Sequence, residues 1–443
     1  MNEAPVAENQ SVAVPTVTPT AAPAIPVVEK EPMKSKVTVT ELAAAVAAVK
    51  PFINSRPSLP ILSNVCLTQT KGRLAFHATN LDCSIVTAIE SDSMKQGSTT
   101  LPVRQLADIL KGCKDDVWIE TDKHDKISIA SGGTSSTVLG LPAEEYPSSK
   151  TCRADREEQI PQGLFKTMLD RVRRCQSTDE TRYVLNGVLL ERKAGKVRVV
   201  ATDARRLAVS ERETDIVGQD FACIIPRDTV DKVFRLLQAD GEGVFGSLKI
   251  EVEYDQEAFD KAVKEAVKQK WPEPVLCSEN NGLRIRFSFD AKIGKNSKAV
   301  TLPVVVTSRT IQGTYPNYRQ VIPTECLECI EIPRKELADR VAQVATNVRC
   351  DNQPIVRLTF TKKLLTVLTR NNDGGESKSA IELQHVPTKE RVIAFNPGYL
   401  IDALQSVPEH ETVLLEMTDE LSPGMFKING ENWTYVLMPM RAN

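Results

Sequence analysis

The sequence predicts an α+β protein of three similar domains, each with two helices packed on antiparallel sheets. The first observation is a helix start that contains proline and recurs at Pro102, Pro226 and Pro397, with apolar residues at helical spacing after each. A second helix start recurs at 39–41, 160–162 and 332–334. In both series the first step is roughly 120 residues and the second roughly 170, far longer than a solenoid repeat. The repeated unit is therefore a domain, and a chain of 443 residues has room for about three.

Landmarks outside the helices keep the same spacing. Thr79 in an Ala-Thr-Asn triplet and Thr202 in an Ala-Thr-Asp triplet lie 123 residues apart. Prolines that follow β-type runs recur at Pro147, Pro316 and Pro439. The repeat therefore extends over the whole unit.

Within each unit the pattern predicts a helix, several short strands, a second helix and further strands. In the first unit the β-type stretches are 65–68, 74–77, 85–89, 117–121, 127–130 and 136–139. Two helices cannot cover both faces of so many strands. We therefore expect them to pack together on one face of the sheet.

Composition excludes several classes of function. Hydrophobic residues make up 41% of the chain, and the formal net charge is −2, so the total charge does not indicate a nucleic-acid binder. The chain has ten cysteines and four histidines, and only Cys326 and Cys329 have the spacing of metal ligands, without a second pair. No glycine-rich phosphate loop or nucleophile elbow is present. We expect no catalytic residue, no metal and no cofactor, and unpaired cysteines favour a cytoplasmic location.

The N-terminal stretch 1–34 differs from the rest. It is rich in Pro, Ala, Val, Thr and Glu, shows no helical or strand periodicity, and lacks the basic start of a signal peptide. A disordered tail is predicted here. No stretch of the chain reaches the length of a membrane-spanning helix.

Charge on the predicted helices is uneven. The segment 161–176 carries Lys166, Arg171, Arg173 and Arg174 against Asp170 alone. The same excess recurs in Arg104, Lys111 and Lys114, and in Arg334, Lys335, Arg340 and Arg349. Each helix alone could have an ordinary solvated face, but the recurrence favours one shared basic surface. Similar domains joined end to end can close into a ring, and a basic inner wall would hold a polyanion without reading its sequence.

Five motifs carry a resemblance to a known family. They are 56–62 (RPSLPIL), 182–188 (RYVLNGV), 201–208 (ATDARRLA), 315–318 (YPNY) and 435–441 (YVLMPMR). In order and spacing they resemble the bacterial replicative sliding clamp, the beta subunit of DNA polymerase III, from about residue 33 to 441. The resemblance implies three DNA-clamp domains per chain and a head-to-tail homodimer that forms a ring around duplex DNA. It also implies a non-catalytic processivity factor for DNA replication.

The same resemblance implies the domain boundaries and partners. The tail would span 1–34 and the clamp domains 35–150, 155–325 and 330–443, with an insertion at about 243–282 in the second. Expected partners are duplex DNA, bound without sequence preference, a second copy of the chain, the polymerase III alpha subunit, the clamp loader and other proteins with a clamp-binding motif of the Gln-Leu-x-Leu-Phe type. No membrane partner is expected.

Site residues follow from the matching positions. A pocket for partner peptides between the second and third domains would be lined by Arg182, Leu185, Thr202, Arg205, Arg206, Leu207, Pro316, Val321, Val436, Leu437, Met438, Pro439, Met440 and Arg441. DNA contacts would come from Arg56, Arg104, Tyr183 and Arg227. Leu, Val and Met provide an adaptable groove for an apolar anchor, while Arg can bind a carboxylate or a carbonyl.

Departures from the family pattern are few. Asp228 follows Arg227 where a second basic residue is common, and Ala204 replaces a common glycine of the pocket loop. Inside the insertion Phe259 begins an apolar stripe at helical spacing that ends at Trp271, which predicts a helix docked on the outer face of its own domain. Met33 resembles the start of shorter family members.

Two other functions remain open at this point. One is a three-domain enzyme that uses Arg205, Asp203 and Tyr183, which would need a deep pocket with perturbed acids. The other is an adhesion or scaffold protein built from repeats, which would form no ring and have no salt-sensitive affinity for DNA.

Overall fold

The structure is a computed structural model that describes residues 32–54, 57–148, 152–214, 220–239, 246–254, 282–294, 299–348, 353–361, 363–384 and 389–441. The first domain contains β1 (Lys34–Val37), α1 (Val39–Val49), β2 (Asn64–Thr70), β3 (Arg73–Thr79), β4 (Cys83–Glu90), β5 (Asp92–Lys95), β6 (Gly97–Pro102), α2 (Val103–Leu110), β7 (Val117–Thr121), β8 (Lys126–Ser131) and β9 (Thr134–Leu139).

The second and third domains repeat this order without a counterpart of β5. The second contains β10 (Arg156–Pro161), α3 (Gln162–Arg173), β11 (Gly187–Lys193), β12 (Lys196–Thr202), β13 (Arg206–Glu213), β14 (Phe221–Pro226), α4 (Arg227–Leu236), β15 (Ser247–Tyr254), β16 (Gly282–Ile293) and β17 (Val300–Arg309). The third contains β18 (Glu328–Pro333), α6 (Arg334–Ala345), β19 (Val356–Phe360), β20 (Leu364–Arg370), β21 (Glu376–Glu382), β22 (Arg391–Phe395), α7 (Pro397–Gln405), β23 (Thr412–Met417), β24 (Gly424–Lys427) and β25 (Trp433–Leu437). The predicted α+β fold with two helices per domain is confirmed for the described residues.

The strands form antiparallel sheets, two of which cross a domain boundary. One eight-stranded sheet has the order β10-β15-β16-β17-β4-β3-β2-β6, so β17 of the second domain pairs with β4 of the first. The other has the order β14-β11-β12-β13-β25-β24-β23-β18, so β13 of the second domain pairs with β25 of the third. A five-stranded sheet (β5-β1-β7-β8-β9) and a four-stranded sheet (β21-β20-β19-β22) lie at the two ends of the chain's arc.

Proline marks the end of an edge strand before four of the helices. Pro102, Pro161, Pro226 and Pro333 are the last residues of β6, β10, β14 and β18, and each is also the N-cap of the next helix. All four strands lie at sheet edges, where a residue without an N–H costs no ladder hydrogen bond. β1 is an inner strand, and α1 after it is capped by Thr38 instead.

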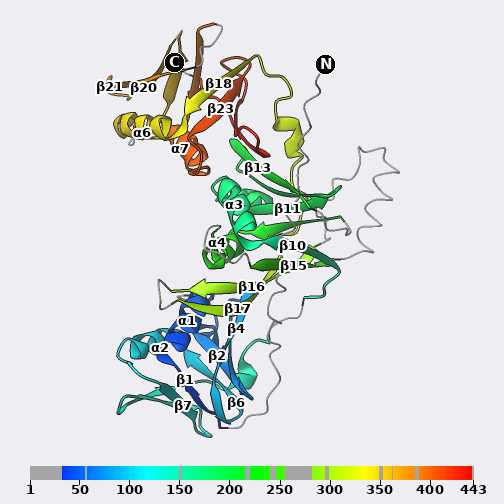
Figure 1. The fold of residues 1–443 in the computed structure, drawn as a ribbon, viewed down its shortest axis with the longest axis vertical. Coiled ribbons are helices and arrows are strands. Elements are labelled where there is room, and N and C mark those ends of the chain that lie inside the picture. The colour runs from blue at the N-terminus through cyan, green and yellow to red at the C-terminus, as the bar shows by residue number, and fades with distance from the viewer. Residues whose placement is uncertain are drawn as a thin grey trace, which may run out of the picture.

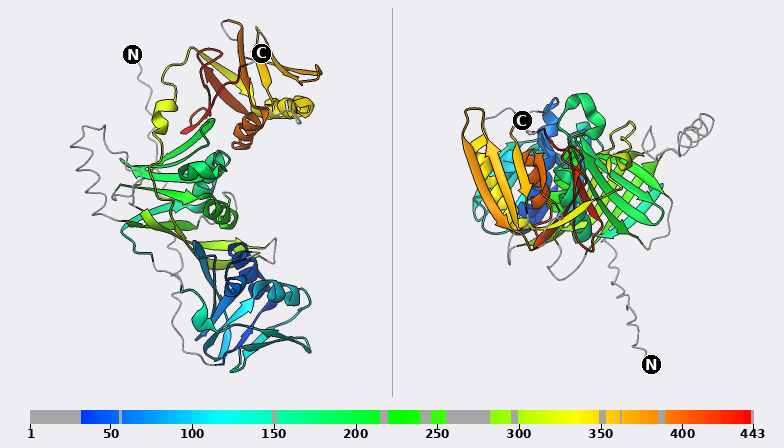
Figure 2. Two further views of the ribbon diagram at one scale, coloured as in Figure 1. Left: turned by 180° about the vertical axis from the view of Figure 1, so that it is seen from behind. Right: turned by 90° about the horizontal axis from the view of Figure 1, so that it is seen from above.

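The helices of each domain pack against each other on one side of the chain, as predicted. α1 contacts α2, α3 contacts α4, and α6 contacts α7. Figure 1 shows the three domains along an arc with all six of these helices on its concave side and sheets on the outside, and Figure 2 shows the same arrangement from behind. The geometry is that of one part of a ring with helices on its inner wall.

Two expected boundaries need correction. Met33 is fully buried in the core and its backbone N–H donates to Thr121 Oγ1 at 2.7 Å, while Lys34 begins β1, so the expected tail of 1–34 ends too late. The segment 247–254, expected within the insertion, forms β15, which pairs with β10 and β16 as an integral strand. The extra chain therefore lies between β15 and β16, at 255–281. Those residues, with the expected helix from Phe259 to Trp271, are outside the described part.

Candidate DNA surface and partner pocket

The turn between β12 and β13 is held by its own side chains. Thr202 Oγ1 accepts a hydrogen bond from the Ala204 N–H at 3.1 Å, and Asp203 Oδ1 accepts from the N–H groups of Arg205 at 2.9 Å and Arg206 at 3.0 Å. Ala204 has φ +70°, the left-handed conformation that glycine adopts without strain. Alanine at this position is therefore strained, which is a conformational reason for the glycine that the family resemblance implied here.

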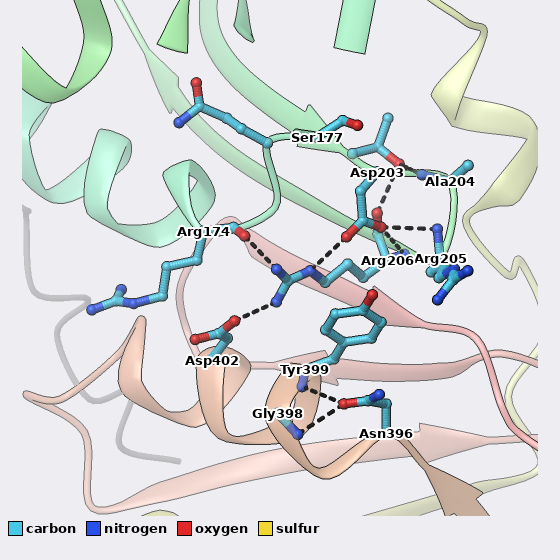
Figure 3. Close-up of polar contacts among 12 residues, drawn as sticks. Arg174, Ser177, Asp203, Ala204, Arg205, Arg206, Asn396, Gly398, Tyr399 and Asp402 are labelled. Carbon is cyan, nitrogen blue, oxygen red and sulfur yellow. Dashed lines mark hydrogen bonds and ion pairs between the residues drawn. The ribbon is translucent and has the colours of Figure 1, made fainter. Parts of the chain in front are cut away.

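Arg206 lies at the centre of the joint between the second and third domains. Its Nε donates to Asp203 Oδ2 at 3.0 Å, Nη1 to Asp402 Oδ2 at 2.6 Å and Nη2 to the Arg174 carbonyl at 2.5 Å (Figure 3). Nη1 also donates to the Tyr435 hydroxyl at 3.3 Å. The guanidinium also stacks 4.3 Å from the ring centroid of Tyr399 on α7. All three nitrogens are engaged, and four of the five N–H donors of Arg206 form hydrogen bonds within the described residues, so its main role is to stabilise the joint.

A cavity of about 610 Å³, which we call the arginine cavity, opens at this joint. It is lined by residues of the chain after α3, of the β12–β13 turn, of the first turn of α4 and of α7. Its charged lining residues are Arg174, Arg182, Arg205, Arg206 and Arg227, with Asp179, Asp203 and Asp402. Three predicted pocket residues therefore meet in this cavity: Arg182, Arg205 and Arg206. The predicted DNA contact Arg227 lines it as well.

A separate apolar cluster lies under the linker between the second and third domains, the segment 310–327 between β17 and β18. It contains Leu185, Leu207 and Val436 of the predicted pocket, packed with Tyr315, Tyr318 and Met425 among others. Tyr318 anchors the linker: its hydroxyl donates to Glu191 Oε2 at 3.0 Å, and burial raises the pKa of Tyr318 to about 12. The cluster is buried, so its residues form the floor beneath the linker.

The remaining predicted pocket residues lie around this cluster. Pro316 and Val321 are exposed on the linker, Thr202 closes the β12–β13 turn, and Leu437 is fully buried in the main core. The last segment crosses the joint. Its Met438 N–H donates to the Arg205 carbonyl at 3.0 Å, and its Met440 N–H donates to the Ala394 carbonyl at 2.7 Å. Met438, Pro439 and Met440 are half-buried and Arg441 is exposed.

The joint between the first and second domains has the same backbone and different side chains. Leu81, equivalent to Ala204, has φ +79°, and the Arg309 N–H donates to the Asp82 carbonyl at 2.9 Å, as Met438 does to Arg205. The side chains differ, however: the cross-strand pair Leu207–Val436 of the second joint corresponds to the pair Ser84–Thr307 at this joint. The hydroxyl groups of Ser84 and Thr307 do not form an apolar cluster. The cavity at this joint measures only about 60 Å³, against about 610 Å³ for the arginine cavity. The apolar cluster at the second joint is therefore specified by side chains and not by the shared backbone.

The predicted DNA contacts are placed differently from one another. Arg104 is exposed on the first turn of α2, and Arg227 is exposed as the first residue of α4. Tyr183, with 57% of its surface exposed, lies in the short helical turn before β11. Arg56 is outside the described residues.

The expected place on the basic face of α3 is wrong for Arg171. Arg171 is only 3% exposed and points into the third domain, where Nη1 donates to Glu431 at 2.5 Å and Nη2 to Glu409 at 2.8 Å. Burial alone would favour the neutral acid, but the hydrogen bond and charge of Arg171 outweigh it and hold the pKa of Glu431 below its usual value. Arg173 and Arg174 both pair with Asp170. Arg171 thus joins two domains, while Arg173 and Arg174 pair with an acid on their own helix. The number of charges on a helix could not predict this, since it does not say which way each side chain points.

Other exposed cations lie near the same helices. Lys50 at the end of α1 and Arg235 near the end of α4 are exposed, although the sequence did not indicate them, and so are Lys114 and Lys335 of the predicted basic surface. Within the described part of the chain, none of these four has an ion pair. Lys50, Lys114 and Arg235 lie at or after the C-terminal end of a helix and Lys335 lies in the first turn of α6, so nearness to a helix end was the signal available in the sequence.

Chemistry of other kinds has no support in the described residues. Groups of three or more potential metal ligands do not occur among them, and Cys326 and Cys329 are exposed. Asp203 uses its carboxylate in the turn and on Arg206, which opposes a role as a catalytic acid. Across the described helices, none is long and apolar enough to span a membrane.

Comparison with known families gives three matches in chain order. Residues 33–150 match the DNA polymerase III beta subunit N-terminal domain, 159–267 its central domain and 319–441 its C-terminal domain. Together the three stretches cover more than three quarters of the chain.

Individual relatives agree with these matches. The beta sliding clamp of Proteus mirabilis is 26% identical over 396 residues, which is 88% of this chain and 94% of that protein. The crystal structure of the DNA polymerase III subunit beta from Pseudomonas aeruginosa has a TM-score of 0.78 at 24% identity, over 93% of this chain and all of that one. The sliding clamp of Bartonella birtlesii bound to griselimycin has a TM-score of 0.76 at 26% identity, with the same coverage.

Proposed function

This chain belongs to the DNA polymerase III beta subunit family, the beta sliding clamps, and from that membership we propose how it closes a ring, holds DNA and receives partners. As a member of the family it is a non-catalytic processivity factor of DNA replication. The single observation that carries the proposal is that the helices of all three domains line one concave face of an arc. The protein acts in the cytoplasm.

Two chains close the ring head to tail as a homodimer. In each joint within the chain, the strand in the position of β4 pairs with the strand in the position of β9 from the next domain, as β4 pairs with β17 and β13 with β25. Two strands of these types remain at sheet edges, β21 in the third domain and β9 in the first. Pairing of β21 with β9 of a second chain repeats the same joint for the ring seam, and it removes two exposed edges.

DNA passes through the ring and is held by its phosphates. Arg104, Arg227 and Lys335 are exposed on three of the helices that line the concave face, one in each domain. Cations that contact phosphates give weak binding that ignores sequence and falls with salt. Tyr183 and Arg56 remain proposed contacts from the family resemblance.

Partner proteins bind at the joint between the second and third domains. The half-buried segment from Met438 to Met440 supplies the surface for an apolar peptide anchor. It follows directly on β25, whose Val436 belongs to the buried apolar cluster. Partners are the polymerase III alpha subunit, the clamp loader and other proteins that carry the clamp-binding motif.

The ring is tested by sedimentation and by negative-stain images of the purified chain. A species of twice 48.9 kDa with a central hole is expected. Leu139, 72% exposed on the free edge strand β9, should lie at the seam, so Leu139→Asp should weaken the dimer about tenfold or more. Leu421→Asp is the matched control, because Leu421 is 70% exposed between β23 and β24, which belong to a different sheet from β21. A chain that stays monomeric at high concentration, or equal effects of both variants, would overturn the seam.

DNA binding is tested by anisotropy of a labelled duplex at several salt concentrations. Arg104→Gln and Lys335→Gln each remove one cation from the concave face, and each should reduce the slope of log K against log salt by about 0.9 if that cation binds a phosphate. Lys123→Gln, on the β7–β8 turn of the first domain, is the control with the same change of charge. A strong preference for one duplex sequence at equal salt contradicts the proposal.

A further inference from the structure

The arginine cavity carries a positive charge that the chain itself does not neutralise. Its five arginines and three aspartates leave a formal charge of +2 on the lining. Asp203 and Asp402 both bind the guanidinium of Arg206 and so are already occupied. Asp179 lies 3.9 Å from Arg182, at the outer limit of an ion pair.

The uncompensated charge resides on two side chains. Arg205 and Arg227 are exposed, and neither forms an ion pair with any residue in the described ranges. Arg205 is fixed at its backbone by the Asp203 turn and by Met438, so its position is defined even though its side chain is free. Figure 3 shows Arg205 beside the turn, away from the buried network of Arg206. A ligand of this cavity must therefore bring negative charge.

A buried acceptor in the same cavity requires a donor. Gln176 is 5% exposed, and its Nε2 donates to the Arg173 carbonyl at 2.9 Å, which orients the amide. Its Oε1 is buried without a hydrogen-bond partner among the described residues. A buried acceptor without a partner costs free energy, so a ligand with an N–H group would be favoured there.

We propose that the arginine cavity binds an acidic segment of the same partner peptides whose apolar anchor occupies the neighbouring pocket, with a peptide carboxylate on Arg205 and a peptide N–H on Gln176. Arg227 adds to the positive charge of the cavity and remains a proposed DNA contact. The inference rests on the proposed function of that pocket. Arg182, Arg205 and Arg206 line the cavity and are also predicted residues of the pocket, and Met438 of the pocket is hydrogen-bonded to the Arg205 carbonyl. One extended peptide can therefore reach from the pocket into the cavity.

The donor requirement favours a peptide over a nucleic-acid strand. A phosphodiester backbone would satisfy the arginines, but it has no hydrogen-bond donor for Gln176 Oε1. A peptide supplies an N–H at every residue except proline, and Asp or Glu supplies the anion. Both chemical features of the cavity are met by one acidic peptide.

Two labelled peptides test the proposal by fluorescence anisotropy. Both contain the Gln-Leu-x-Leu-Phe motif, and they differ only in two flanking residues, Asp-Asp in one and Asn-Asn in the other. The wild-type chain should bind the Asp peptide about fivefold more tightly at low salt, and this preference should shrink as salt screens the charges. Arg205→Gln should remove most of the preference, and Lys123→Gln should leave it unchanged.

The outcomes distinguish failure of the acidic-segment proposal from failure of the proposed apolar pocket. Equal binding of the two peptides to the wild-type chain overturns the acidic segment and leaves the apolar pocket standing. Binding of neither peptide overturns both. If Arg205→Gln instead weakens binding of a labelled oligonucleotide and does not change peptide preference, the cavity is a phosphate site and the proposal is wrong.

Discussion

Arg206 Nη1 lies 2.6 Å from Asp402 Oδ2, and this contact joins β13 of the second domain to α7 of the third. The arginine is 8% exposed and the aspartate 35% exposed, so the pair is buried on one side only. Because Arg206 also binds Asp203 and the Arg174 carbonyl, one guanidinium ties together the turn, the end of α3 and the next domain.

Loss of Arg206 should destabilise this joint strongly. Arg206→Met leaves Asp203 and Asp402 without their cation, and removal of one partner of a buried charge pair costs about 3–5 kcal/mol. Urea unfolding followed by fluorescence should show a decrease in the free energy of unfolding of that order. Arg205→Met changes an exposed neighbour and should stay within about 0.5 kcal/mol. A similar small loss in both variants would mean that the network contributes little.

Ala204→Gly should stabilise the chain or leave it nearly unchanged. A left-handed φ of +70° costs an L-residue about 1 kcal/mol, and glycine avoids that cost. The greater entropy of unfolded glycine offsets about 0.4–1 kcal/mol of the gain. Ala47 lies on the exposed face of α1, where glycine relieves no strained φ and only raises the entropy of the unfolded chain. Ala47→Gly should therefore destabilise the fold by about 1 kcal/mol. Thermal unfolding of the two variants tests the difference in sign.

Stability should fall as the pH decreases from 7.5 to 5, and His77 should be a main cause. Burial lowers the pKa of His77 from 6.5 to about 4, so the folded chain keeps the ring neutral while the unfolded chain takes a proton. The contribution is fully present above pH 6.5 and is lost progressively between pH 6.5 and about 4. Over the measured interval the loss is about 2 kcal/mol.

The control for this pH effect is His77→Phe, which keeps a ring beside Tyr146 and cannot titrate. The free energy of unfolding in urea is measured at pH 7.5 and at pH 5 for both proteins. The difference between the two pH values should be about 2 kcal/mol smaller in the variant than in the wild-type chain. An unchanged pH dependence would mean that other groups cause it.

Deletion of the last six residues should weaken partner binding and spare the ring. Removal of 438–443 takes away the half-buried methionines while β25 keeps its pairing with β13. Burial of one apolar anchor is worth about 1.5–3 kcal/mol, so affinity for a labelled Gln-Leu-x-Leu-Phe peptide should fall about tenfold or more. Sedimentation should show an unchanged dimer. Equal peptide affinity, or loss of the dimer together with the peptide, would show that the pocket is misplaced.

Local sequence determined the elements and their repetition. Pro102, Pro161, Pro226 and Pro333 each end a strand and start a helix, because proline lacks the N–H that an inner strand needs and its fixed φ suits a helix start. The shared landmarks Thr79 and Thr202 fall at equivalent strand ends. These features depend on neighbours in the chain, so they could be predicted from one sequence.

Tertiary structure decided what lies across a domain boundary. The pairing of Leu207 with Val436 places residues 229 positions apart in one sheet, and no local pattern specifies that register. The same reason explains why the prediction for Arg171 is wrong. Its periodicity places it on a helix, but only the packed third domain brings Glu409 and Glu431 to it. Sequence determines which side chains a helix or strand carries, whereas contacts between distant segments determine which of them are buried, neutralised or left free to bind.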